Sequence, residues 1–218
     1  MKGWLRLLAG AAGLTLVSPL LAPQLLAFPY KTQTAIGTVW SEHQLDPATL
    51  DRQVATARER LATSPLASAH ETRPIFITDG GWRWTWLALQ SRGGFALTRP
   101  LTVAVVVNQT DPQTGTIANG AAIGGKRKLG PVLAHEFTHG LIRRHFGPVR
   151  AAMFPTWKVE GYADHVAGES SLSKADAATL EREGRNHPAL PYFHGRRRVA
   201  EILRDNGGDV DALFSRDN

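Results

Sequence analysis

The chain contains no cysteine among its 218 residues. This absence excludes a disulfide scaffold, thiol catalysis, a cysteine-ligated zinc site and an iron–sulfur cluster. Any bound metal must therefore be held by histidine and carboxylate side chains. Apolar residues make up 43% and charged residues 20% of the chain, which is too apolar for a disordered protein, and the length suffices to bury a core.

Acidic residues are missing from the start of the chain, because no aspartate or glutamate precedes Glu42. Lys2 and Arg6 form a short basic stretch, and residues 7–28 carry no charge. This pattern is typical of a secretory signal or an uncleaved membrane anchor. We expect residues 1–27 to be a signal peptide or N-terminal anchor. Residues 28–218 are expected to form one domain on the periplasmic or extracellular side, either tethered to the membrane or secreted.

Beyond residue 28 the pattern predicts strands first and helices afterwards. Short apolar runs predict strands at 74–78, 101–107 and 117–123, whereas helical periodicity predicts helices at 47–63, 131–146, 156–169, 174–184 and 197–205. Residues 82–90 are ambiguous, because their tryptophans alternate as in a strand while their second half fits a helix. The order predicts an α+β fold with an N-terminal mixed sheet and a helical C-terminal half.

The most informative segment is 135–139, with the sequence His-Glu-Phe-Thr-His. His135 and His139 are four residues apart on a predicted helix, so both imidazoles project from one face, one turn apart. Two nitrogens in that position can bind one Zn²⁺ ion. Glu136 flanks the same face and can accept a proton from a metal-activated water. This helix is therefore the predicted active-site helix.

A catalytic zinc ion needs a third protein ligand, and the sequence offers two candidates. His145 stands where a metzincin places its third histidine, but Ile142 replaces the glycine that lets such a chain leave the helix. Glu160 is the rival, because Glu160 and Asp164 share one face of a second predicted helix. Asp164 can then accept a hydrogen bond from the far ring nitrogen of a liganding histidine.

The two motifs together resemble the gluzincin metallopeptidases, the thermolysin-like clan. The resemblance covers about 30 residues and consists of the 135–139 motif and the 157–164 segment, Trp-Lys-Val-Glu-Gly-Tyr-Ala-Asp. It implies that His135, His139 and Glu160 ligate Zn²⁺ and that Glu136 is the general base. It also implies that Asp164 is the carboxylate behind a histidine ligand.

The resemblance further implies a small zincin-like fold whose sheet has an edge strand beside the active-site helix. We expect residues 117–123 to be that strand and extended substrate to pair with it. Family members often stabilise the transition state with a histidine or tyrosine further along the chain. Tyr192 and His194 are the candidates here, chosen from their position alone.

The sequence thus predicts a zinc-dependent peptidase, an endopeptidase in particular, acting on a peptide or protein substrate. Two alternatives stay open: a non-catalytic envelope-associated protein with a structural or degenerate zinc site, and a metzincin-like peptidase with His145 as third ligand. Arginines gather in the helical half, at 143, 144, 150, 182, 185 and 196–198. They favour association with an anionic membrane surface. No nucleic-acid partner is expected, because no binding motif accompanies them.

Overall fold

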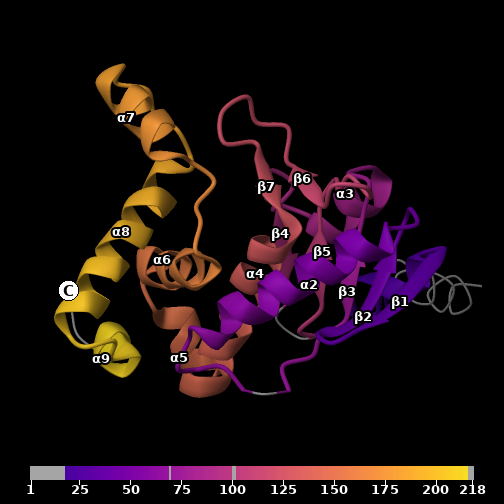
Figure 1. Cartoon of the computed structure of the whole chain (residues 1–218), viewed down its shortest axis with the longest axis horizontal. Coiled ribbons are helices and arrows are strands. Elements are labelled where there is room, and N and C mark those ends of the chain that lie inside the picture. The colour runs from indigo at the N-terminus through magenta and orange to yellow at the C-terminus, as the bar shows by residue number, and fades with distance from the viewer. Residues whose placement is uncertain (1–17, 69, 100–101, 216–218) are drawn as a thin grey trace, which may run out of the picture.

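Five short strands form the main sheet of the computed structural model, which describes residues 18–68, 70–99 and 102–215 (Figure 1). The strand order is β1-β2-β3-β5-β4. The strands are β1 Tyr30–Thr34, β2 Gly37–Ser41, β3 Ile75–Ile77, β4 Ala96–Thr98 and β5 Val105–Val107. The pairs β2–β3 and β3–β5 are parallel, whereas β1–β2 and β4–β5 are antiparallel. The sheet is therefore mixed, as predicted, and β4 is one of its edges.

Helices occupy most of the remaining chain. The α-helices are α2 Pro47–Ala62, α3 Trp82–Ala88, α4 Leu129–Phe146, α5 Pro148–Met153, α6 Thr156–Ala167, α7 Lys174–Arg182, α8 Leu190–Asp205 and α9 Val210–Ser215, and a 3-10 helix, η1, spans Pro23–Leu26. A separate hairpin pairs β6 Thr116–Ala118 with β7 Lys126–Lys128. Figure 1 shows the sheet on one side of α4 and the C-terminal helices on the other. The fold is thus α+β with a helical C-terminal half.

Helix α2 begins and packs as its sequence predicts. The Asp46 side chain accepts a hydrogen bond from the backbone N–H of Thr49 at 2.8 Å, and Pro47 occupies the first turn. Both features stabilise a helix start, since this N–H lacks a partner within the helix and the proline ring presets φ. The apolar stripe of α2, residues 50, 54, 57 and 61, is buried against α4 and the sheet.

Helix α4 lies in the centre of the fold, between α2, α6 and the strands β4 and β5. Its side chains from Leu129 to Thr138 are all buried, together with Leu141 and Ile142. A helix that is apolar on nearly every side must be enclosed by other elements. The two histidine positions on α4 are therefore set by a helix that is packed on several faces at once.

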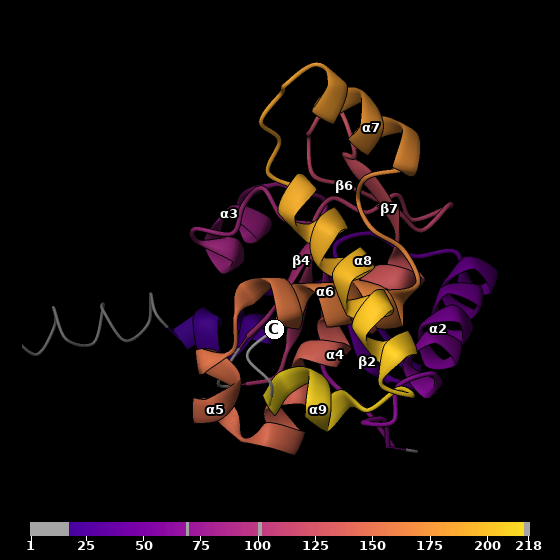
Figure 2. The same ribbon diagram turned by 90° about the vertical axis from the view of Figure 1, so that its left-hand side faces the viewer.

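Helices α6 and α8 cross closely at a pair of glycines. A Cβ atom on Gly161 would lie 2.5 Å from the backbone oxygen of Gly195, so neither position can carry a larger side chain without moving a helix. Figure 2 shows α8 running past α6, with α7 at one end and α9 at the other. This contact fixes α6, which carries Glu160 and Asp164, between α8 and the central helix α4.

The end of the predicted signal or anchor segment contacts the domain. Arg99 donates hydrogen bonds to the backbone oxygen of Leu20, and Arg83 donates one to that of Leu26. The ring of Phe28 lies 5.3 Å from that of Phe76 on the sheet. Residues 1–17 of the segment lie outside the described residues. Within the described residues, no helix combines the length and the apolar character that a membrane span requires.

Two strand predictions need correction, and the structure resolves the ambiguous tryptophan run. The strand predicted at 117–123 ends at Ala118 and pairs with β7, because the chain turns through Gly120 and Gly124 with φ of 82° and 64°. The strand predicted at 101–107 is formed at 105–107; residues 100 and 101 lie outside the described part. The ambiguous tryptophan run is helix α3, which buries Trp84 and leaves the other two tryptophans exposed.

Candidate metal centre

His135 and His139 project from one face of α4 and bring their Nε2 atoms to 3.2 Å from each other. Two imidazole nitrogens that bind one tetrahedral zinc ion at about 2.0–2.1 Å must lie about 3.3 Å apart. The observed distance matches that requirement. The ligand atoms of His135, Glu136 and His139 all lie within 4.8 Å of one another, so the 135–139 motif folds into a group at metal-binding distance.

Glu160 approaches this pair from helix α6. Its Oε2 lies 3.3 Å from Nε2 of His135, and its Oε1 lies 3.7 Å from Nε2 of His139. Burial alone would raise the pKa of the Glu160 carboxyl, but the two histidines and Arg127 outweigh burial and lower it to about 2. Glu160 is therefore a carboxylate at neutral pH, facing both nitrogens.

Asp164 lies one turn after Glu160 on α6 and contacts the other side of the first imidazole. Nδ1–H of His135 donates to Oδ1 of Asp164 at 2.8 Å. Asp164 is 2% exposed, and Arg127 on β7 pairs with the same oxygen at 3.2 Å. A hydrogen bond at Nδ1 fixes the ring orientation and directs Nε2 toward the metal position. Asp164 and Arg127 thus hold the orientation of His135.

The surroundings shift the pKa of the two imidazoles in opposite directions. Burial would lower the pKa of His135, but its hydrogen bonds with Asp164 and Glu160 raise it to about 10. The pKa of His139 is lowered, mainly by burial. Without a metal, His135 is therefore charged and His139 is neutral at pH 7. A cation bound between them takes the place of one proton, because only a deprotonated nitrogen can be a ligand.

Glu136 is oriented by the edge strand of the sheet. Oγ1 of Thr98 on β4 lies 2.7 Å from Oε2 of Glu136 and 2.8 Å from its backbone oxygen. Glu136 is 6% exposed and neighbours both histidines, yet the ion pairs of those imidazoles run to Glu160 and Asp164. The Glu136 carboxylate is therefore left beside the nitrogen pair with a fixed orientation.

A cavity of about 750 Å³ gives access to these groups. Besides the histidines and carboxylates already described, it is lined by residues 95–98, of which 96–98 form β4, and by His187, Tyr192 and Arg143. Nη2 of Arg143 is buried and has no hydrogen-bond partner in the described part of the chain. Burial raises the pKa of the Tyr192 phenol, and the carboxylates of Glu160 and Asp164 raise it further. Tyr192 therefore stays a hydrogen-bond donor at neutral pH.

Two candidates from the sequence lie elsewhere. Nε2 of His145 is 2.8 Å from Oδ1 of Asp211 on α9, because α4 continues as a helix to Phe146 and turns His145 away from the cavity. Nε2 of His194 is 3.0 Å from Oε1 of Glu181 on α7, and the His194 side chain is 51% exposed. Neither lines the cavity that holds the histidine pair.

Sequence reasoning missed three residues of the site: Thr98, Arg127 and Arg143. Thr98 belongs to a three-residue strand, which is too short to produce a clear pattern. Arg127 stands between two lysines and looks like part of a solvated charge run, yet its side chain is 8% exposed. In the sequence, Arg143 looks like one of the many arginines of the helical half. Its position one turn after His139, on the motif's own face, is the signal that could have identified it.

Comparison of the chain with protein-family models, with curated proteins and with solved structures finds no match. The site therefore has to be interpreted from its own geometry. Two imidazole nitrogens on α4 lie 3.2 Å apart, and the two oxygens of Glu160 on α6 lie 3.3 and 3.7 Å from them, one oxygen facing each nitrogen. The carboxylate of Glu136 stands beside this group. Nitrogen and oxygen donors in this number suit a divalent ion such as Zn²⁺, which takes three protein ligands at catalytic sites.

Proposed function

We propose that this protein is a zinc-dependent peptidase of the gluzincin type, with His135, His139 and Glu160 as the metal ligands. The observation that carries the proposal is the Glu160 carboxylate facing the nitrogen pair: the two Nε2 atoms lie 3.2 Å apart, Oε2 of Glu160 lies 3.3 Å from Nε2 of His135, and Oε1 lies 3.7 Å from Nε2 of His139. Two nitrogens and a carboxylate at these distances can share one small ion. Three protein ligands leave a fourth position open for water or substrate. That open position distinguishes a catalytic site from a closed structural one.

When bound, zinc supplies a Lewis acid that polarises a carbonyl group and makes water a stronger acid. Glu136 acts as the general base: its carboxylate takes a proton from the attacking water and passes it to the leaving amine. Thr98 holds one carboxylate oxygen of Glu136 and leaves the other to accept that proton. No covalent intermediate on the protein is needed, which agrees with the absence of cysteine.

Tyr192 and Arg143 are the proposed stabilisers of the oxyanion that forms during attack. Both line the cavity with the histidine pair, and both offer N–H or O–H donors. Donors that are already aimed at the position of a developing negative charge stabilise it without having to reorient during the reaction. His194, the other sequence candidate, is paired with Glu181 instead.

Strand β4 is the proposed docking edge for an extended peptide substrate. It is the last strand in the sheet order, it packs beside α4, and Ala96, Leu97 and Thr98 line the cavity. An extended peptide can add to such an edge through backbone hydrogen bonds. Its scissile carbonyl would then pass close to Glu136, which Thr98 on the same strand contacts.

The two alternatives differ from the peptidase proposal in specific residues. A metzincin-like site would need His145, whose imidazole contacts Asp211 and lies outside the cavity. A purely structural zinc site would give no role to Glu136, which Thr98 holds beside the proposed ligands while the ion pairs of both histidines run to other carboxylates. Both observations favour the gluzincin arrangement.

We also propose that the domain is exported and stays at a membrane surface. The segments around α3 and η1, which Arg83 and Arg99 join by hydrogen bonds, expose large apolar side chains. These are Leu21, Leu25, Trp82, Trp86 and Leu89. Tryptophan is enriched where proteins meet the membrane interface. Residues 18–28, which continue the apolar N-terminal sequence, lead directly into this surface. Vesicle co-sedimentation of Trp82→Ser/Trp86→Ser against the wild-type chain tests the contact.

The test of the enzymatic proposal compares the wild-type chain with Glu136→Gln. Both are assayed for bound zinc by elemental analysis and for cleavage of a mixed peptide library by mass spectrometry. We expect one zinc per chain in both, and cleavage that falls by at least about a thousandfold in the variant, because the general base is lost. A zinc-loaded wild-type chain that cleaves no peptide in the library would contradict the proposal.

A further inference from the structure

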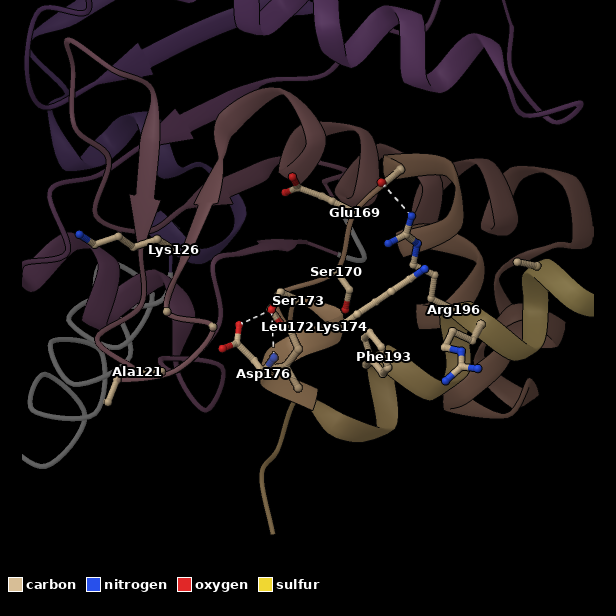
Figure 3. A pocket seen from close by; sticks show the side chains of 17 residues that line it. Ala121, Lys126, Glu169, Ser170, Leu172, Ser173, Lys174, Asp176, Phe193 and Arg196 are labelled. Carbon is tan, nitrogen blue, oxygen red and sulfur yellow. Dashed lines mark hydrogen bonds between the residues drawn. The ribbon is translucent and has the colours of Figure 1, made fainter. Parts of the chain in front are cut away.

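A second cavity, of about 790 Å³, adjoins the metal centre (Figure 3). Its walls come from the connection between β6 and β7, from the segment 168–174 after α6, and from α8. Ala121, Gly124 and Ser171 line both this cavity and the one that holds the histidine pair. The two cavities therefore adjoin each other along these three residues.

The second cavity is basic at its end near α8. Lys174, Arg196 and Arg197 line it, and none of the three forms an ion pair within the described ranges of the chain. Arg196 donates one hydrogen bond, to the backbone oxygen of Gly168 at 2.8 Å. Lys126 also lines the cavity, but Figure 3 shows its side chain pointing away from Arg196. Three cationic side chains thus remain available to an anionic ligand.

The two acidic residues of this cavity already have partners. Glu169 pairs with Arg127 at 3.0 Å. Asp176 accepts a hydrogen bond from Oγ of Ser173 at 2.7 Å (Figure 3). In addition, Oγ of Ser170 is buried in the cavity wall and has no hydrogen-bond partner in the part of the chain that the structure describes. Buried hydroxyl groups are nearly always hydrogen-bonded in native proteins, so this one points to a missing acceptor.

The wall between the cations is apolar. Phe193 is 7% exposed and Leu172 is 3% exposed, and both line the cavity. The guanidinium of Arg197 lies 5.9 Å from the centre of the Phe193 ring. An acidic side chain that enters here can place its methylene groups against Phe193 and Leu172 and its carboxylate among the cations and the Ser170 hydroxyl.

We propose that this cavity binds an acidic side chain of the peptide substrate and makes the enzyme select peptides with a glutamate or aspartate near the scissile bond. This proposal rests on the peptidase function proposed above. A carboxylate suits the pocket because the unpaired cations and the unpaired hydroxyl are all donors. Because the pocket adjoins the metal centre, we infer that its ligand is a side chain of the bound substrate rather than a separate small anion.

The first test measures kcat/KM for peptides in which one glutamate is moved along an otherwise neutral sequence, each matched by a peptide with glutamine at that position. All peptides are amidated at the C-terminus, so only the side chain offers a carboxylate. We expect about tenfold faster cleavage for glutamate at one or two positions, since charge-assisted hydrogen bonds are about twice as strong as neutral ones. Equal rates for every glutamate–glutamine pair would overturn the proposal.

The pocket variant is Lys174→Gln/Arg197→Gln, and the matched control is Arg182→Gln, which removes an exposed arginine of α7 that does not line the cavity. The pocket variant should lose the preference for glutamate, so that its kcat/KM for each glutamate peptide becomes equal to that for the matched glutamine peptide. The control should keep the preference. If the control lost the preference as fully as the pocket variant, the overall charge of the surface would explain it and the pocket assignment would be wrong.

A binding measurement separates a failure of this proposal from a failure of the peptidase function. Fluorescence anisotropy of the labelled glutamate and glutamine peptides is measured on zinc-loaded Glu136→Gln, with and without the pocket substitutions. If no peptide is cleaved by the wild-type chain but the glutamate peptide binds about tenfold tighter, the pocket assignment stands and the peptidase function fails. Equal binding of the two peptides overturns the pocket assignment, whatever the cleavage assay shows.

Discussion

Replacing Asp164 by asparagine should weaken zinc binding without unfolding the protein. Asp164 accepts the Nδ1–H of His135 at 2.8 Å and is 2% exposed, so it holds the imidazole in a place where water cannot substitute for it. Asparagine has nearly the same size, but its amide is neutral and accepts this hydrogen bond less strongly. Removing such a partner of a histidine ligand typically lowers metal affinity by about 10–100-fold, or roughly 1.4–2.7 kcal/mol.

The assay is competition for zinc with a chromogenic chelator at pH 7, using protein whose fold has been checked by circular dichroism. Glu169→Gln is the matched control. Glu169, like Asp164, forms an ion pair with Arg127, but it does not contact His135. We expect its zinc affinity to stay within about threefold of the wild type. A folded Asp164→Asn variant with wild-type zinc affinity would refute the role assigned to Asp164.

Three further predictions follow from other contacts. Gly140→Ala should destabilise the fold by about 1–3 kcal/mol, measured by urea unfolding, because its Cβ would lie 1.8 Å from the buried guanidinium of Arg73. Burial alone would raise the pKa of the Glu71 carboxyl, but the hydrogen bonds from Arg73 and Arg144 outweigh burial. The net pKa of Glu71 therefore lies below its ordinary value of 4.5. Its stabilising effect is therefore present above pH 4.5 and lost as the pH falls through the folded-state pKa, so Glu71→Gln should destabilise the protein at pH 7 and progressively less as the pH is lowered below 4.5. Tyr192→Phe should lower kcat by about a hundredfold with little change in KM, if the phenol donates to the oxyanion.

Helix α2 and the histidine motif on α4 could be predicted because both follow local rules. Asp46 and Pro47 mark the start of α2, and the spacing of His135 and His139 determines which face of a helix they share. Local signals of this kind survive in the fold because they depend on residues within one or two turns. The separation of 3.2 Å between the two Nε2 atoms follows from this spacing and from the rotamers that packing imposes.

The contacts between distant segments could not be predicted in the same way. The edge strand beside α4 is β4 rather than 117–123, and its three residues carry no alternating pattern. Gly161 lets α6 approach α8 closely, but its partner on α8, Gly195, lies 34 positions further along the chain. Arg127 could not be told from its solvated lysine neighbours, because only the fold brings it to Asp164. Each of these contacts depends on how separate elements pack.

The most direct test of the metal site is a crystal structure of the zinc-loaded protein, with the ion located by anomalous diffraction at the zinc edge. The proposal predicts one ion at about 2.0–2.2 Å from Nε2 of His135, Nε2 of His139 and a carboxylate oxygen of Glu160, with a fourth position open to solvent. An ion held by His145, or by the histidine pair without Glu160, would contradict the assignment. So would a zinc-loaded crystal in which the anomalous signal lies away from helices α4 and α6.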